Sequence, residues 1–453
     1  MHHTGGPFEF APDILTSSIV SDANTQLGLS NDKVFWTRSD LLPLFLFVAF
    51  IVSAILIEYF QWQDRNVFNS FYLFSPLLFS FLILCLYFLS KRYISPKILA
   101  YLLFFTVSLT TIVGYTEPLT GKYNDSHSLL LFGLSFYTAY FAYHIFTNKI
   151  NNASIWVASN PLLLITGPIA TKFKSQAHKR VVDRVSYYLP FLLVGTFFFK
   201  IIASPLTNYF WMLDLTNSLE VIVFGLIFEL FIYFNFCGLS LIVFSIFGFF
   251  GVRIPLNFKQ PFSSDHIIDY WKNWHRSLST VLKTLFYSPT RKSYPTSLAL
   301  FIVFISSAMW HGVTVNFLIW GIFHASMFII TIKLLSKEYK ILSTFLMIFT
   351  IIIGRVIFAD SETDRLIMKL TPSFEAMGTN ISFFINSSKH SLVSLVLALF
   401  FVGIEFFLRK RKHFRERTYK FLRLPVAQLI LASLFVLLAI DSMGMNYPVY
   451  GQR

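Results

Sequence analysis

The sequence has few charged residues. Asp, Glu, Lys and Arg make up only 13% of its 453 residues, whereas 55% are hydrophobic. An ordinary soluble domain carries about 25% charged residues. A soluble protein of this length could bury a core, but it could not cover its surface with so few charges. The composition therefore excludes a soluble globular protein and predicts a membrane protein that crosses the bilayer many times.

Cysteine and acidic residues are also scarce. The two cysteines, Cys85 and Cys237, both lie in apolar runs, which predicts inert core thiols and excludes a disulfide framework or a zinc motif. Lys and Arg number 37 against 23 Asp and Glu, which gives a formal net charge of +14. In a soluble protein this excess would point to nucleic acid. In a membrane protein it is expected in cytoplasmic loops, so we expect no nucleic-acid partner.

The chain shows no internal repeat, no low-complexity tract and no separate soluble domain. Residues 1–40 are polar and mixed in charge, so we expect no cleavable signal peptide, and the first membrane helix would direct insertion. We therefore expect a polar N-terminal segment over 1–40 and one membrane domain over 41–453.

Long apolar runs are what the chain does have. A membrane helix needs about 20 apolar residues. Shorter runs would be brief spans or re-entrant segments, which protein or water must cover. We predict an all-α polytopic membrane protein with roughly 11 transmembrane helices, plus re-entrant or interfacial helices, around a central tunnel. The expected spans are 41–60, 72–90, 98–115, 128–147, 186–204, 218–236, 313–332, 341–358, 390–408 and 425–441, and the shorter runs are 154–170, 238–250 and 297–310.

The loops predict the topology by the positive-inside rule. The segment 251–296 carries a basic excess and is expected on the cytoplasmic side, while 116–127 and 359–389 are mixed and are expected outside. Three more loops are strongly basic and should also be cytoplasmic: "KRYISPK" (91–97), "KFKSQAHKRVVDR" (172–184) and "RKRKHFRERTYKFLR" (409–423).

The polar insert 251–296 is too polar to span the membrane and too aromatic for a free linker. Its stretch "SSDHIIDYWKNWHRSLSTVLKTLFY" has helical amphipathicity, and Asp265 after two serines suits an N-cap. One interpretation is an interfacial helix with an aromatic belt. The apolar face of this helix would hold Ile267, Trp271, Trp274, Leu278, Val281, Leu282 and Leu285.

Two Trp-His pairs indicate a site. Trp274-His275 lies in this insert, and Trp310-His311 lies in an apolar run, where an ionisable group costs several kcal/mol unless it is partnered or faces water. This placement permits both histidines to face one buried cavity. His324 follows His311 by 13 residues, about 220° around a continuous helix. It would then point away from His311 unless the helix breaks at a glycine, so we expect a packing or supporting role for it.

Several of these residues carry a resemblance to a known family. They belong to a set of motifs within residues 127–360: "NFKQPF" (257–262), "DYWKNWHRSLS" (269–279), "WHG" (310–312), "WGIFH" (320–324), "GLSFYTAYFAYHIF" (133–146), "ITGPI" (165–169), "YFNFCGLSLIVFSIFG" (233–248) and Arg355 with Phe358-Ala359. In these motifs the chain resembles the membrane-bound O-acyltransferases, in particular the bacterial branch that includes the alginate O-acetyltransferase membrane subunit and the teichoic acid D-alanyltransferase.

The resemblance implies roles for these residues. Acyl transfer to a hydroxyl needs a base, stabilisation of the oxyanion and exclusion of water. His311 would be the general base in a pocket shaped by Trp310. His275 would be a second essential group that orients the donor or, if protonated, polarises the thioester carbonyl. Trp274 and Asn273 would contact substrate, and Asp269 would either contact the donor or, the favoured alternative, be a structural cap.

Buried charges and missing motifs complete the expected site. Glu229 and Arg355 lie in apolar spans and would either line the cavity or form a structural ion pair, whereas Glu405 is expected to be structural. The sequence holds no metal-ligand set, no glycine-rich phosphate loop and no G-x-S-x-G elbow. We therefore expect no bound cofactor and no metal. The cosubstrate would be an acyl thioester, either acyl-CoA or an acyl carrier protein, attracted by the basic insert.

The resemblance implies a multi-pass O-acyltransferase of the bacterial inner membrane, surrounded by membrane lipid, that modifies hydroxyls of a cell-surface polysaccharide. Acetyl is the first choice of acyl group, D-alanyl the second and a fatty acyl group the third. An extracytoplasmic glycan-modifying partner could complete the transfer. A glycan or lipid transporter is the alternative class. The chain departs from the family pattern at Lys283-Thr284 and at "YSPTRK" (287–292). These departures affect the expected acceptor and partner more than the expected chemistry.

Overall fold

The structure is a computed structural model. It describes residues 83, 85, 87–88, 93–106, 108, 125–150, 154, 157, 168–176, 178–212, 218–334, 339–360, 363–371 and 389–407. Most of these residues are helical. Five of their helical stretches are long and apolar enough to cross a membrane: Val181–Phe210, Ser218–Phe249, Val315–Lys333, Ile341–Ala359 and Lys389–Phe407.

This result confirms a helical protein with several membrane-capable spans. Each of the five stretches coincides with a predicted span. The predicted spans 41–60 and 425–441, most of 72–90, the segment 1–40 and the loop 409–423 lie outside the described residues. The expected number of about 11 spans therefore stays a prediction.

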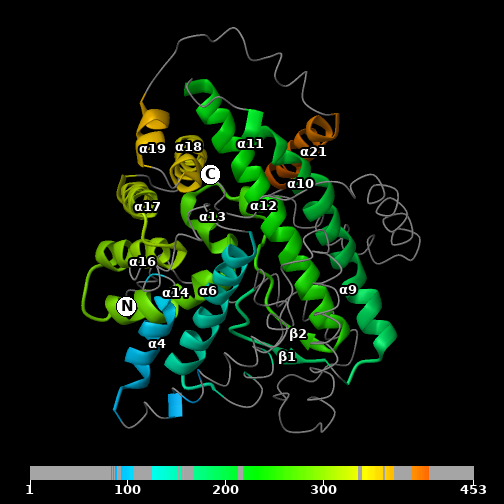
Figure 1. The fold of residues 1–453 in the computed structure, drawn as a ribbon, viewed down its shortest axis with the longest axis vertical. Coiled ribbons are helices and arrows are strands. Elements are labelled where there is room, and N and C mark those ends of the chain that lie inside the picture. Colours follow the sequence, from blue (N-terminus) through cyan, green and yellow to red (C-terminus); the bar gives the residue numbers. More distant parts are fainter. Residues whose placement is uncertain are drawn as a thin grey trace.

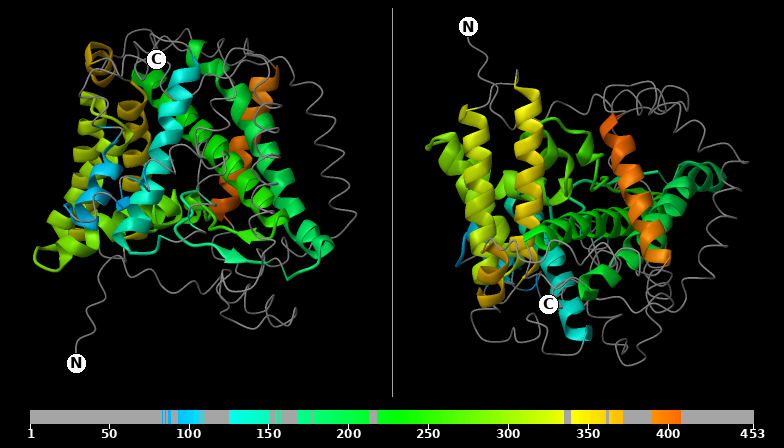
Figure 2. Two further views of the ribbon diagram at one scale, coloured as in Figure 1. Left: turned by 60° about the horizontal axis from the view of Figure 1, so that its bottom comes forward. Right: turned by 90° about the horizontal axis from the view of Figure 1, so that it is seen from above.

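Helix α12 (Ser218–Phe249) is the central element, and it unites the predicted span 218–236 with the shorter run 238–250. It is apolar around its whole circumference, which is typical of a helix that is buried on all sides. It packs against α9 (Val181–Thr196), α18 (Lys340–Ala359) and α21 (Lys389–Phe407). Figures 1 and 2 show it running obliquely across the molecule, with α17 (Val315–Leu334) and α18 on one side and α21 on the other.

Two glycines set the close crossing of α12 and α9. A Cβ atom added at Gly195 would lie 2.8 Å from the carbonyl oxygen of Gly238, and one added at Gly238 would lie 2.6 Å from the carbonyl oxygen of Gly195. The backbones therefore meet without side chains between them, as membrane helices do at small residues. Beyond this crossing the chain continues as η3 (Phe197–Ala203), α10 (Ser204–Leu206) and α11 (Asn208–Met212).

The polar insert is joined to another basic loop by a short strand pair. Strand β1 (Lys174–Ser175) pairs antiparallel with β2 (Val252–Arg253), with Lys174 opposite Arg253. The loops 172–184 and 251–296 therefore lie together, in agreement with the prediction that they share one membrane face. The insert continues as η4 (Pro261–Ser263), α13 (Ile267–Asn273), α14 (Arg276–Leu282), η5 (Lys283–Tyr287) and α15 (Ser288–Arg291).

The prediction of one amphipathic helix starting at Asp265 is wrong. The N-cap of α13 is His266, whose Nδ1 accepts a hydrogen bond from the Ile268 amide at 3.1 Å. The helix then stops at Asn273, because Trp274 is extended and His275 adopts a left-handed conformation with φ 41°. A new helix, α14, starts at Arg276. Trp274 and His275 therefore lie at the break between α13 and α14.

The second Trp-His pair also ends a helix. The predicted short run 297–310 lies in helix α16 (Thr296–His311). This apolar helix has 16 residues, fewer than the roughly 20 residues of a full span. Gly312 follows with φ 152°, a backbone region that favours glycine, and α17 starts at Val315. The break that the sequence allowed at this glycine is thus present. The remaining described helices are α4 (Pro96–Phe104), α6 (Asp125–Phe146) and α19 (Thr363–Leu370).

Candidate active site

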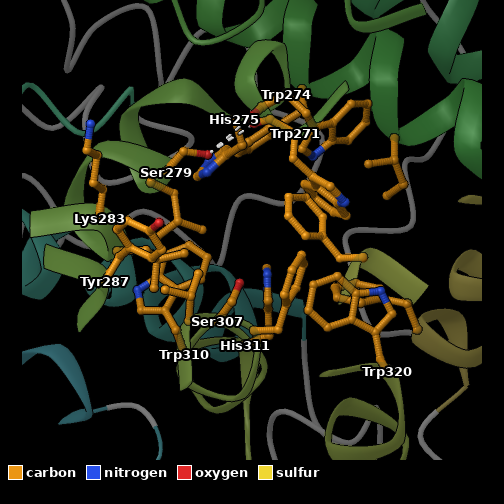
Figure 3. Close-up of a pocket in the computed structure, with 18 of the residues that line it drawn as sticks. Trp271, Trp274, His275, Ser279, Lys283, Tyr287, Ser307, Trp310, His311 and Trp320 are labelled. Atoms are coloured by element: carbon orange, nitrogen blue, oxygen red, sulfur yellow. Dashed lines mark hydrogen bonds between the residues drawn. The ribbon is translucent and has the colours of Figure 1, made fainter. Parts of the chain in front are cut away.

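The two histidines line the same cavity. Its volume is about 90 Å³, several times the 10–15 Å³ that one water needs. Figure 3 shows His275 with Trp271 and Trp274 on one side, and Ser307, Trp310 and His311 on the opposite side. The described residues that line the cavity are mostly apolar and aromatic, with Arg355 and Lys283 as the cationic ones and no Asp or Glu among them. This is the shared cavity that the two Trp-His pairs permitted.

His311 is the last residue of α16, and its side chain is only partly buried where it meets the cavity. Its ring centroid lies 4.8 Å from that of Trp310 and 5.0 Å from that of Phe358. Trp310 is itself fixed, because its indole Nε1 donates a hydrogen bond to the carbonyl oxygen of Ser135 on α6 at 3.1 Å. The imidazole therefore lies between two aromatic side chains, one of which is fixed by a hydrogen bond.

His275 is held in a strained conformation by its neighbours. The amide of Arg276 donates to the carbonyl of Asn257 at 2.8 Å, and the Oδ1 atom of Asn257 accepts from the Ser277 hydroxyl at 2.8 Å. The Ser277 hydroxyl in turn accepts from the Ile169 amide at 3.0 Å. Residues in sparsely populated backbone regions persist only where the surroundings fix them, and such residues cluster at functional sites.

The ring of His275 is buried among aromatic side chains. It stacks on Phe236 with centroids 4.9 Å apart, and it lies 6.1 Å from the ring of Trp310. Its Nδ1 atom is buried and has no hydrogen-bond partner within the described part of the chain. Burial lowers the pKa of His275, with a smaller contribution from His311 in the same direction. A neutral ring at pH 7 favours orientation of the donor over cationic polarisation of its carbonyl.

Arg355 reaches the cavity wall and is paired with Glu229. The two form a buried ion pair between α18 and α12, and the Tyr270 hydroxyl donates to the other carboxylate oxygen of Glu229 at 2.7 Å. The Arg355 guanidinium also lies over the ring of Trp274, 4.8 Å from its centroid. Both predicted alternatives therefore hold for Arg355, because it lines the cavity and forms an ion pair. Glu229 is the partner behind the wall, and together they fix the insert against the membrane helices.

Two predicted substrate-contacting residues lie away from the cavity. The carboxylate of Asp269 is exposed and pairs with Lys272 at 3.3 Å. The side-chain amide of Asn273 donates to the carbonyl of Asp269 at 2.9 Å, which closes the end of α13. Neither residue lines the cavity, whereas Trp274 and Trp310 do. The structural-cap alternative for Asp269 agrees better with this placement.

His324 is buried beside the site rather than inside it. Its ring lies 4.7 Å from that of Trp320 and 5.2 Å from that of Trp271, and both of these tryptophans line the cavity. Gly354 on α18 makes room for the imidazole, because a Cβ atom at that position would collide with the His324 ring. The expected supporting role agrees with this position.

Among the lining residues for which the sequence predicts no role are Ser307, Ser279 and Lys283. Ser307 precedes His311 by four residues on α16, so both side chains lie on one helix face, a spacing that could have been read from the sequence. Ser279 donates to the carbonyl of Trp274 at 3.4 Å and lies in the first turn of α14. Lys283 was noted only as a departure from the family pattern, and it begins the π-helical segment η5 on the cavity wall.

Comparison with known proteins places this geometry in context. No family model matches the chain. It is 30% identical over 178 residues to the peptidoglycan O-acetyltransferase of Helicobacter pylori, covering 36% of this chain and 33% of the relative. It is 27% identical over 259 residues to a probable alginate O-acetylase of Pseudomonas syringae pv. tomato, covering 51% of this chain and 49% of the relative.

A third relative is named for the transfer of a different acyl group. The chain is 25% identical over 145 residues to the teichoic acid D-alanyltransferase of Bacillus subtilis, covering 28% of this chain and 37% of the relative. The matched regions span between a third and a half of the length of these curated relatives. All three are membrane-bound O-acyltransferases, and they confirm the resemblance of this chain to that family.

Proposed function

We propose that this protein is a membrane O-acyltransferase that moves an acetyl group from a thioester donor on the cytoplasmic side to hydroxyls of a cell-envelope glycan. The observation that supports it most is the placement of His275 and His311 on opposite sides of one cavity. His275 lies at the start of α14 and His311 at the end of α16, and both imidazoles line the same cavity. A transport pathway has no need of such a pair of imidazoles, whereas acyl transfer needs a positioned base.

His311 is the general base of the proposed reaction. It takes the proton of the acceptor hydroxyl as the hydroxyl oxygen attacks the thioester carbonyl carbon. When the tetrahedral intermediate collapses, the carbon–sulfur bond breaks and the same proton passes to the departing thiolate. The aromatic residues around His311 exclude water, which would otherwise hydrolyse the thioester.

The lining of the cavity favours a short, uncharged acyl group. A D-alanyl group carries an ammonium at neutral pH, and burying it beside cationic side chains is unfavourable unless a carboxylate compensates. The described lining contains Arg355 and Lys283 but no Asp or Glu. A cavity of about 90 Å³ also suits a two-carbon acyl group better than a fatty chain. We therefore propose acetyl, which two of the three relatives described above have in their names.

The donor is proposed to enter through the insert. Residues 251–296 carry His275 and several Lys and Arg residues, and their strand pair with the basic loop 172–184 brings more positive charge beside them. Coenzyme A and acyl carrier proteins are both anionic, so this surface would attract either donor. The acceptor would reach His311 from the opposite membrane face, directly or through a partner protein, and the protein would act in the inner membrane of a bacterium.

The test is acetyl transfer by the purified protein in detergent, with acetyl-CoA or an acetylated carrier protein as donor and a glycan oligosaccharide as acceptor. His311→Ala is expected to lower the transfer rate by about 10²–10⁴-fold, the usual effect of losing a general base. His178→Ala, which changes an exposed histidine of the loop 172–184, is the matched control and should leave the rate unchanged.

The outcomes separate the alternatives. A folded His311→Ala protein with near wild-type transfer would contradict the proposed mechanism. Transfer of D-alanine but not acetate from carrier-bound donors would keep the enzyme class and change the acyl group. Movement of a labelled glycan or lipid across vesicles without acylation would indicate a transporter instead.

A further inference from the structure

Besides Nδ1 of His275, three further buried ring nitrogens next to the cavity have no hydrogen-bond partner within the described residues. They are Nε1 of Trp271, Nε1 of Trp320 and Nδ1 of His324. The three rings touch one another: the centroids of Trp271 and Trp320 lie 6.1 Å apart, and His324 lies 5.2 Å from the first and 4.7 Å from the second. They come from α13 and α17, two elements that are distant in the sequence.

Such a cluster is costly unless something occupies it. Buried polar groups are normally hydrogen-bonded, and a native structure that leaves one unpaired calls for an occupant or a catalytic role. The same protein satisfies another buried indole: Trp310, also on the cavity wall, donates to the carbonyl of Ser135 at 3.1 Å. Two indoles without acceptors beside one with an acceptor indicate that the missing acceptor arrives with a ligand.

The chemistry of the indoles restricts what that ligand atom is. An indole N–H only donates, so the occupant must present lone pairs to it. His324 does not restrict the choice further, because its Nδ1 donates or accepts according to its tautomer. Trp271 and Trp320 both line the cavity, and Trp320 lies 6.0 Å from the ring of His311, the proposed base. The occupant is therefore an acceptor oxygen close to the reacting groups.

We propose that the indole N–H groups of Trp271 and Trp320 bind the carbonyl oxygen of the thioester and stabilise the oxyanion that forms from it. This inference rests on the proposed function. As the acceptor hydroxyl oxygen bonds to the carbonyl carbon, its proton moves to His311 and the π electrons of the carbonyl move onto the oxygen. That negative charge is held by the two N–H groups until the carbon–sulfur bond breaks. Preorganised donors of this kind strengthen their bonds in the transition state.

His324 is a positioning residue in this arrangement. Its ring contacts both tryptophans, and it stacks on Phe304 with centroids 6.0 Å apart and an interplanar angle of 14°. Gly354 leaves the space in which the imidazole sits. The imidazole thus fixes the separation of the two indoles without lining the cavity itself.

The experiment replaces each indole by a ring that lacks the N–H. Trp271→Phe and Trp320→Phe are compared with Trp310→Phe in the full-length protein, by steady-state kinetics with acetyl-CoA and an acceptor oligosaccharide and by thermal unfolding in detergent. Trp320→Phe is expected to lower kcat by about 10²-fold with little change in either KM. Its midpoint of unfolding should fall only through the lost packing of the buried ring, because the resting protein loses no hydrogen bond. Trp310→Phe should lower the midpoint further, because its bond to Ser135 is lost as well.

Each other outcome overturns the proposal. Wild-type kcat in both Trp271→Phe and Trp320→Phe excludes a role of these indoles in the reaction and would leave a buried water as the occupant. A rise in the acceptor KM without a fall in kcat would assign the site to an acceptor hydroxyl instead. His311→Ala is run in parallel: if it abolishes transfer while the tryptophan variants are fully active, only this inference fails. If it is fully active, the proposed role of His311 as the general base fails as well, and the proposed function itself fails if the wild-type protein transfers no acyl group.

Discussion

At the scale of single residues, the site is built from side chains whose surroundings leave them little freedom. The buried pair of Glu229 and Arg355 is the clearest case, because each is almost inaccessible and the pair joins two membrane-capable helices. A buried ion pair is weak evidence for net stability, but removing one partner leaves an uncompensated charge. The pair therefore fixes the position of Arg355 on the cavity wall.

Glu229→Gln tests this role. The amide is the same size and can still accept from the Tyr270 hydroxyl, but Arg355 loses its carboxylate. We expect a loss of about 3–5 kcal/mol in the free energy of unfolding, measured by denaturation in mild detergent. Asp183→Asn removes the carboxylate of an exposed pair with Arg180 and should change the stability little. Equal effects of the two substitutions would show that the buried pair does not hold the helices together.

At the scale of elements, glycine controls how closely helices approach. At the crossing of α9 and α12, Gly195 and Gly238 face each other backbone to backbone. Overpacking such a contact forces the helices apart, at a cost of typically 1–3 kcal/mol. Because α12 carries Glu229 and packs on α18, a shift there would also move the cavity wall.

Gly238→Ala is expected to destabilise the protein by about 1–3 kcal/mol and to reduce acyl transfer, because the new methyl group would lie 2.6 Å from a carbonyl oxygen. Gly403→Ala on α21 makes the same change where nothing lies within 4 Å, and it should be neutral or slightly stabilising. Thermal unfolding and transfer are measured on both. If Gly238→Ala matches Gly403→Ala in both measurements, the close crossing is not a structural requirement.

The same elements show how far the sequence could predict the site. The end of α16 at His311 could be foreseen, because Gly312 marks a helix break within the chain itself. The break at His275 could not, because its left-handed backbone depends on Asn257 and Ser277 and on the Ile169 amide from a distant segment. The apolar residues on both sides of His275 have helical spacing, so their periodicity predicts one continuous helix through this residue. The contacts of Trp271 and Trp320 could not be predicted from the sequence either, because contacts between separate elements depend on the tertiary fold.

At the scale of the whole molecule, the reaction needs two faces. The donor is proposed to approach from the cytoplasm and the acceptor from the other side, so the basic loops must gather on one face. The strand pair between 172–184 and 251–296 joins two of these loops directly. The loops 91–97 and 409–423 are assigned to the same face by their Lys and Arg content alone.

The orientation can be tested with single cysteines in a protein whose two native cysteines are replaced by serine. Tyr93→Cys, His178→Cys and Arg415→Cys each place one thiol in a basic loop, and Ser373→Cys places one in the segment 359–389. On intact cells, an impermeant thiol reagent should label only Ser373→Cys, and all four should react after the membrane is opened. The reason is the Lys and Arg bias, which sets orientation during insertion. Labelling of Tyr93→Cys or Arg415→Cys from outside would separate that loop from the donor face. Labelling of His178→Cys from outside would place the insert 251–296 on the outer face as well, because β1 and β2 are paired. The thioester would then have to reach His275 from outside the cell.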